Sequence, residues 1–126
     1  MTRKRNDNHS TEFGLWLREQ VNIDSKFGYI ATNIDYIWRN YKTGQWMIIE
    51  EKRYNTDVTF AQRKTFEIIN RSVNDVNYKG FYILIFEKTS PDDGRIFLRG
   101  LQDKKNAEIT KEQLLFFLRF SGGDAK

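Results

Sequence analysis

The chain contains no cysteine, and its single histidine is His9. Without cysteine it can form no disulfide, no thiolate metal site and no cysteine nucleophile. His9 lies in a polar N-terminal segment, so we expect no catalytic or metal-binding role for it. A Ser-His-Asp triad, and zinc sites built from several His or Cys ligands, are therefore excluded. A protein without cysteine fits the reducing cytoplasm, which is the localisation we expect.

Proline and long apolar runs are also scarce. One proline occurs among 126 residues, and no apolar run approaches the roughly 20 residues that cross a bilayer. No signal peptide is recognisable. Hydrophobic residues make up 39% of the chain and aromatic residues 15%, which suits a folded core. We expect a single domain over residues 10–126, preceded by a flexible basic arm over residues 1–9.

Charged residues of both signs are abundant, with a small basic excess. The chain carries 21 basic and 17 acidic residues, which gives a net charge of +4 at neutral pH. This excess weakly favours a polyanionic partner, because a positive potential attracts phosphates. The arm contains the cluster Arg3-Lys4-Arg5. It could bind phosphates, or it could be a solvated tail that binds nothing.

A β-hairpin is expected within residues 31–54. Two runs of β-branched and aromatic residues flank a turn that contains Gly44, a pattern typical of strand, turn and strand. In the register that this turn favours, Asp35 lies opposite Glu50. Lys52 is two residues beyond Glu50, so its side chain projects from the same face.

Asp35 and Glu50 would be two like charges in directly opposed positions, which destabilises a sheet. Taking each carboxylate out of water costs on the order of several kcal/mol. The alternative is a solvated strand end with surface ion pairs, worth about 0–1 kcal/mol each. Against that alternative, four apolar residues at 46–49 lead directly into Glu50. We therefore expect a cation between the two carboxylates.

An Asp on one strand followed by Glu-x-Lys on the next resembles the PD-(D/E)xK nuclease superfamily, which includes restriction endonucleases and Holliday junction resolvases. The resemblance covers about residues 10–86, and Ile34 stands where the motif has proline. It implies an α/β fold with a restriction-endonuclease-like αβββαβ core, in which helices cover both faces of a mixed sheet. It also implies a Mg²⁺-dependent deoxyribonuclease, with Mn²⁺ as a substitute, that hydrolyses phosphodiester bonds in DNA.

The resemblance implies roles for individual residues of the hairpin. Asp35 and Glu50 would bind the metal, together with the carbonyl of Glu51 and the side chain of Glu12. Oxygen ligands of this kind suit a hard cation. Lys52 would position the attacking water or stabilise charge that develops on the phosphate.

Glu12 is assigned from its place on a helix that we expect from Ser10, the N-cap, to Val21. The superfamily often has a metal-proximal Glu on the helix before its first catalytic strand. The alternative is that Glu12 only complements the helix dipole, since acidic residues are favoured in a first turn. Glu19, two turns further along, is the reserve candidate.

Gln62 is the fourth catalytic candidate, after Asp35, Glu50 and Lys52. It falls on the apolar stripe of a helix expected over residues 59–73, where a polar side chain needs a partner. The superfamily frequently places a Gln here, and its role would be to orient Lys52 or to bind a ligand. The alternative is a partly exposed position at the edge of the stripe.

Apolar runs and turn signals predict three more elements: strands over residues 81–86 and 95–101, and an apolar helix over residues 111–120. Thr110 and Gln113 form a capping box at the start of that helix, and Gly122 would end it. The remaining strand of the superfamily core would lie near residues 27–30.

Two alternatives stay open. The chain could be a non-catalytic nucleic-acid-binding or protein-interaction module on the same fold, because a fold does not fix an activity. If it is a nuclease, its small size without a separate recognition module suits structure-directed cleavage of junctions or branched DNA. The partners considered are DNA and, through the apolar last helix, a second copy of the chain; no membrane partner is expected.

Overall fold

A computed structural model describes residues 11–120 of the chain. The chain divides into two compact units, Met1–Asn33 and Ile34–Lys126, which are described separately below. The predicted basic arm lies outside the described residues. The last helix ends at Leu118 with Arg119 as its C-cap, so the prediction that it runs to residue 120 and is ended by Gly122 was wrong. No helix in the described part is long and apolar enough to cross a membrane.

The first unit contains one short helix, α1 (Glu12–Arg18), followed by two single 3₁₀ turns. The Thr11 hydroxyl accepts a hydrogen bond of 3.1 Å from the Gly14 N–H, so Thr11 is the N-cap and the prediction of Ser10 was wrong. The helix also ends before the predicted Val21, which instead begins a 3₁₀ turn. Residues 11–33 contain no strand, so the strand predicted near residues 27–30 is not found.

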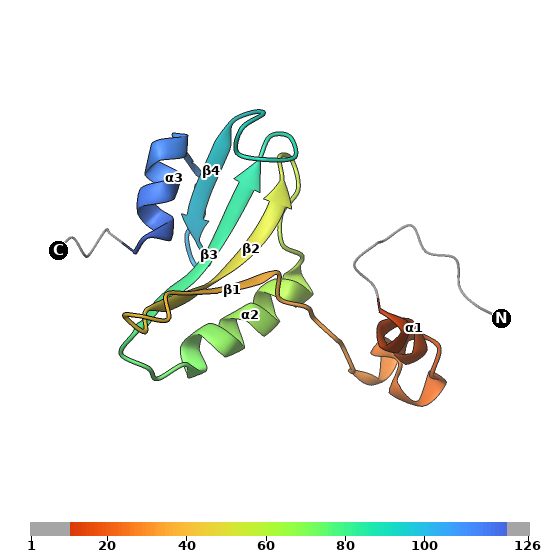
Figure 1. Ribbon diagram of the computed structural model, residues 1–126. Coiled ribbons are helices and arrows are strands. Elements are labelled where there is room, and N and C mark those ends of the chain that lie inside the picture. Colours follow the sequence, from red (N-terminus) through yellow and green to blue (C-terminus); the bar gives the residue numbers. More distant parts are fainter. Residues whose placement is uncertain (1–10, 121–126) are drawn as a thin grey trace. The chain divides into compact units, whose positions relative to one another are not determined.

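The second unit is built on a five-stranded sheet (Figure 1). Its elements are β1 (Tyr36–Arg39), β2 (Trp46–Arg53), α2 (Phe60–Ser72), β3 (Tyr78–Phe86), β4 (Ile96–Gly100), β5 (Ala107–Ile109) and α3 (Lys111–Leu118). The strands lie in sequence order across the sheet. The pair β2–β3, which α2 connects, is parallel and the other pairs are antiparallel. This arrangement confirms the predicted α/β class and the mixed sheet.

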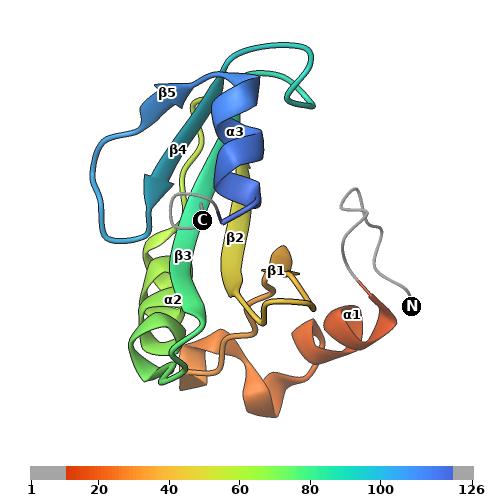
Figure 2. The same cartoon turned by 60° about the vertical axis from the view of Figure 1, so that its left-hand side comes forward.

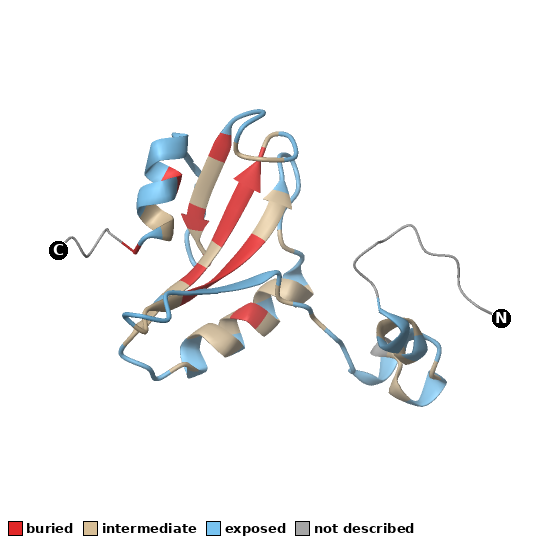
Figure 3. Cartoon of the chain, in the orientation of Figure 1, coloured by how far each residue is buried: buried red, intermediate tan, exposed pale blue. Residues whose placement is uncertain are grey.

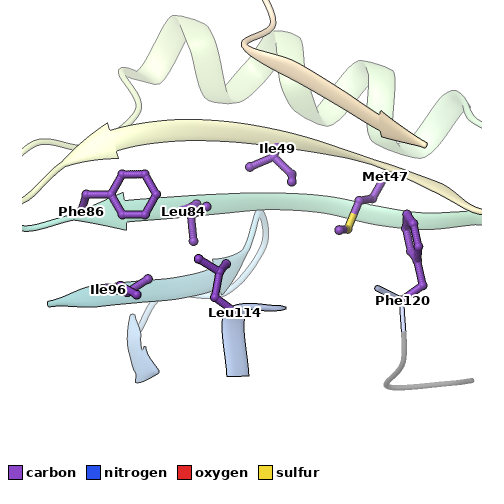
Figure 4. Packing of buried hydrophobic residues seen from close by; sticks show 7 residues of the cluster. All are labelled: Met47, Ile49, Leu84, Phe86, Ile96, Leu114 and Phe120. Carbon is purple, nitrogen blue, oxygen red and sulfur yellow. The ribbon is translucent and has the colours of Figure 1, made fainter. Parts of the chain in front are cut away.

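The two helices of this unit pack on opposite faces of the sheet (Figure 2). Phe66 of α2 packs against Ile48 and Ile83. Leu114 of α3 packs on the other face, in the cluster drawn in Figure 4. Alternate residues of β2 and β3 are therefore buried on both sides, which is typical of strands with helices above and below. This is the mixed sheet between helices that the sequence predicted.

Burial is concentrated in β2 and β3, whereas β1 is exposed along its whole length (Figure 3). Both faces of β1 carry apolar or aromatic residues, yet neither face is buried. The strand lies at the edge of the sheet. Besides its pairing with β2, it is attached through the Trp38 indole N–H, which donates to the Leu118 carbonyl of α3 at 2.7 Å.

A capping box stabilises the N-terminus of each of the helices α2 and α3. Thr59 and Gln62 form a capping box on α2, and Thr110 and Gln113 form one on α3. In each, the threonine hydroxyl and the glutamine side chain satisfy backbone N–H groups that a helix start leaves free. The second box was predicted. The short strand β5 was not, because its three residues are too few to show a period.

Candidate functional site

The hairpin register brings Asp35 and Glu50 to the same place in the sheet. In the β1–β2 ladder Tyr36 pairs with Ile49, and the remaining pairs keep this register. This is the pairing that the sequence predicted. One residue further, at the bend before β1, Asp35 comes opposite Glu50. Opposed residues of an antiparallel pair share a face, and here it is the face that α2 covers.

Glu50 is a buried carboxylate in apolar surroundings. The residue is 4% exposed, because it follows Ile48 on the α2 face and pairs with Ile83 of β3. The Lys52 Nζ lies 3.6 Å from its Oε2. Its Oε1 is buried and has no hydrogen-bond partner among the described residues. Such an atom costs about 1–3 kcal/mol, so a ligand bound to this oxygen would stabilise the fold.

The pKa of Glu50 is raised from 4.5 to about 7. The main cause is burial, which disfavours the charged form, and the second is the negative charge of Asp35. Lys52 acts in the opposite direction and lowers the pKa without cancelling these effects. The effect of Asp35 follows from the register, which places its carboxylate on the same face of the hairpin as Glu50.

Lys52 is held by two partners of different kinds. Its ammonium lies near Glu50 on the same strand and donates a hydrogen bond of 3.2 Å to the Gln62 Oε1 of α2. The same Gln62 oxygen accepts from the Thr59 N–H at 3.0 Å. The start of α2 therefore positions Gln62, and Gln62 in turn positions the lysine. This is the location that we predicted for Gln62.

Asp35 is exposed, but its carboxylate is oriented by the neighbouring strand. Its Oδ2 accepts a hydrogen bond of 2.9 Å from the Glu51 N–H. The side chain of Glu51 follows the strand alternation onto the other face, where it accepts a hydrogen bond of 3.3 Å from the Tyr36 hydroxyl. Only the backbone of Glu51 therefore lies beside the two acids, in keeping with the carbonyl role expected for it.

The second unit brings together Asp35, Glu50, Lys52 and Gln62, but no third acidic side chain joins them. Within residues 11–120 no group of three or more His, Cys, Asp or Glu side chains could hold a metal ion. Glu12, the further ligand expected, lies on α1 in the first unit. Its metal-binding role stays a prediction.

Two basic residues of α2, Arg63 and Lys64, have partners within the fold. The Arg63 Nη1 donates to the Leu101 carbonyl at 2.9 Å and lies 3.7 Å from the Glu67 carboxylate. Lys64 is more exposed and lies 3.9 Å from the same carboxylate. Arg63 therefore connects α2 to the end of β4, which is a structural role.

A second buried charge, which sequence reasoning missed, lies two strands away. Arg99 of β4 is 6% exposed, and its guanidinium pairs with Asp57, in the loop before α2. It also donates to the Asn106 Oδ1 at 3.0 Å. Burial alone would raise the pKa of Asp57, but the hydrogen bond and charge of Arg99 lower it below its usual value. The pair fixes the loop that leads from the Glu-x-Lys strand into α2.

The burial of Arg99 could have been predicted from the alternation of side chains along its strand. Its neighbours Leu98 and Ile96 face the α3 side, so Arg99 and Phe97 face α2. An arginine on the inner face of an apolar strand requires an acidic partner. The sequence gives no way to choose Asp57 as that partner, because the two residues are 42 positions apart.

Comparison with known proteins gives no relative for this chain. No protein-family model matches it, and neither a curated protein nor a solved structure does.

Proposed function

We propose that the chain is a metal-dependent endonuclease that hydrolyses phosphodiester bonds in DNA. The observation that carries the proposal is the buried Glu50 carboxylate, opposite Asp35 and beside Lys52, with one oxygen unpartnered. A sheet gains nothing from two opposed acids. A divalent cation between them would offset both the charge repulsion and the missing hydrogen bond.

The residues present fit a magnesium ion. The carboxylates of Asp35 and Glu50, with the carbonyl of Glu51, would hold it. Magnesium is usually bound through one or two carboxylates, with waters and phosphate oxygens as its other ligands. Two acidic side chains are therefore enough, and Mn²⁺, which accepts the same oxygen ligands, would substitute. When bound, such an ion polarises the scissile phosphate and lowers the pKa of the attacking water.

Lys52 would supply the positive charge that the chain itself contributes to the reaction. Its ammonium is held near the acid pair by Gln62 at 3.2 Å and by Glu50 at 3.6 Å. A cation fixed in this way stabilises the negative charge that develops on the phosphate without having to reorganise. Gln62 would act through Lys52, as a positioning residue.

The order of elements also supports the proposal. The acidic hairpin β1–β2, the helix α2 and the parallel strand β3 follow one another in the order of the last four elements of the αβββαβ core. The likeness concerns the order of elements and the motif, and it adds to the chemistry of the site. Structure-directed cleavage of junctions or branched DNA remains the form of the activity that we favour.

One observation favours a second candidate function. Only two acidic side chains meet at the site in the described part of the chain. A non-catalytic nucleic-acid-binding module on the same fold could retain such a pair without cleaving its ligand.

The test is nicking of a panel of linear, flapped, branched and single-stranded DNA, with Mg²⁺, Mn²⁺ or EDTA. We expect cleavage that EDTA abolishes, and a loss of about 100-fold or more in Lys52→Met, which removes the charge but keeps most of the side chain. Lys79→Met, an exposed lysine on β3, serves as the matched control and should cleave normally. A wild-type protein that cuts none of these substrates with either metal, or a fully active Lys52→Met, would overturn the proposal.

A further inference from the structure

A hollow lies between the β1–β2 turn and the end of α3, the two segments that supply all of its lining residues. Its volume is about 560 Å³, which is within the range of pockets that hold small organic ligands. All of its lining residues belong to the second unit. The proposed cleavage chemistry uses none of them.

The hollow is basic and contains no acid. Arg39, Lys42 and Arg119 line it, and no Asp or Glu does. None of the three takes part in an ion pair with another described residue. This contrasts with Arg63, Arg95, Arg99 and Lys111, which all have acidic partners. Three unpaired cations around one concave surface favour an anionic ligand.

Two aromatic rings accompany the cations. Tyr41 is 76% exposed and Trp38 44% exposed, so both present ring surface to solvent. Asn40 fixes the turn on which Tyr41 stands, because its Oδ1 accepts from the N–H groups of Lys42 and Thr43. Aromatic rings beside cations are the arrangement that binds single-stranded nucleic acids, in which bases stack and phosphates pair.

The C-terminus of a helix carries partial negative charge, which would repel an anionic ligand. At the end of α3 this charge is reduced by hydrogen bonding. The Leu118 carbonyl already accepts the Trp38 indole N–H at 2.7 Å. Phe120 turns the chain with a φ of 57° and is buried. The helix therefore ends with a satisfied carbonyl and with Arg119 in the wall of the hollow.

We propose that this hollow binds a single-stranded segment of nucleic acid, with a base stacked on Tyr41 or Trp38 and phosphates at Arg39, Lys42 and Arg119. The inference rests on the proposed function for the class of ligand, and it adds a second contact that selects unpaired strands. Such a contact would direct the enzyme to flaps, branches or gapped DNA rather than to plain duplex.

The test measures binding of fluorescein-labelled dT₁₀ by anisotropy in EDTA, where no cleavage occurs. Tyr41→Ala should weaken binding about fivefold or more, the low end of the effect of one stacked base. Phe60→Ala is the matched control, because Phe60 is also 76% exposed but lies at the start of α2. Its affinity for dT₁₀ should equal that of the wild type.

The contribution of the cations is tested by salt dependence. The double variant Lys42→Gln with Arg119→Gln should lower the slope of log K against log salt by about 1.4, since each phosphate contact on a single strand contributes about 0.7. The double variant Lys104→Gln with Lys105→Gln removes two exposed lysines outside the hollow and should leave the slope unchanged.

Three outcomes would overturn the inference. One is unchanged dT₁₀ binding in Tyr41→Ala and in the double variant. A second is a loss of dT₁₀ affinity in Phe60→Ala as large as that in Tyr41→Ala. A third is a wild-type protein that does not bind dT₁₀ but binds phosphatidylserine vesicles, when Tyr41→Ala and the Lys42→Gln, Arg119→Gln variant abolish the vesicle binding. Because cleavage is not measured, failure of the two proposals is distinguishable. If the protein binds dT₁₀ at the hollow but cleaves no DNA, only the proposed nuclease activity is overturned.

Discussion

At the scale of single residues, Glu50 shows a conflict between stability and function. The native carboxyl has a pKa of about 7, against 4.5 for the ordinary group. Between these pH values the native state keeps a proton that the unfolded state has lost. The free energy of unfolding therefore falls as the pH rises from about 4.5 to about 7, by at most about 3 kcal/mol.

Glu50→Gln should remove this pH dependence. The amide has nearly the same volume and no charge, so the variant should be more stable than the wild type by about 1–3 kcal/mol at pH 8. The two proteins should have similar stability at pH 4, where the native carboxyl is protonated. Urea unfolding in EDTA between pH 4 and 8 measures the difference. Glu108 is an exposed residue of β5, so the free energy of unfolding of Glu108→Gln should depend on pH as that of the wild type does. The same pH dependence in Glu50→Gln would contradict the assignment of this effect to Glu50.

The residues of the site were predictable where they share one strand or two neighbouring strands. Asp35, Glu50 and Lys52 follow from hairpin register and the two-residue period of a strand, both of which are local. Arg99 and Asp57 were missed because their pairing depends on how β4 and the loop before α2 meet in three dimensions. The burial of Glu50 was expected from the apolar run before it, but the size of its pKa shift required the packed sheet.

At the scale of elements, one side chain of α2 both caps the helix and contacts the proposed site. Gln62 closes the capping box on the Thr59 N–H and also accepts the hydrogen bond of Lys52. Gln113 closes the equivalent box on α3, and no charged partner of its side chain is found among residues 11–120. The two glutamines have the same local role in different surroundings.

Replacing each glutamine by alanine separates these roles. Gln62→Ala and Gln113→Ala should each lower the free energy of unfolding by about 0.5–1 kcal/mol, since each removes one cap hydrogen bond. Only Gln62→Ala should also reduce DNA cleavage, by about 10-fold or more, as outer partners of active groups do. Thermal unfolding and nicking assays on both variants provide the comparison. Equal activities in the two variants would mean that Gln62 is only a cap.

Helix α2 and the hairpin register could be predicted because their signals lie within a few residues. A threonine cap, an apolar stripe and a glycine-containing turn are local features of the sequence. The exposure of β1 could not be predicted. Its residues are as apolar and aromatic as those of β2, and only the order of strands in the sheet determines which of them becomes an edge.

At the scale of the whole molecule, the core belongs to the second unit. All buried residues of the described part lie between Met47 and Phe120. In residues 11–33, Phe13 and Trp16 stack on each other but remain more than half exposed. The stability of the sheet should therefore not depend on the first unit.

A protein lacking residues 1–33 should unfold cooperatively, with a Tm within a few degrees of that of the full chain. None of the described residues between 11 and 33 is fully buried, so we expect their removal to cost the core of the second unit little. Calorimetry of the two proteins tests this expectation. A loss of the cooperative transition would show that the first unit contributes to the core after all.

The predicted role of Glu12 is tested in the full chain, against Glu19, the C-cap residue of the same helix. Glu12→Gln should weaken activation of cleavage by Mg²⁺ about 10-fold or more if its carboxylate binds the ion, whereas Glu19→Gln should not. The reverse result would transfer the role to Glu19. If neither variant alters the Mg²⁺ dependence, the helix contributes no ligand.

The exposed edge strand has a consequence for how the site assembles. Asp35 precedes β1, an exposed edge strand that pairs with a neighbour on one side only, whereas Glu50 is buried in β2, which pairs on both sides. Opening of the edge would separate the two acids, so cation binding and docking of this strand form one linked equilibrium. Amide hydrogen exchange at residues 36–39 should therefore be fast in the metal-free protein and slow when Mg²⁺ is added, while exchange in β3 stays the same.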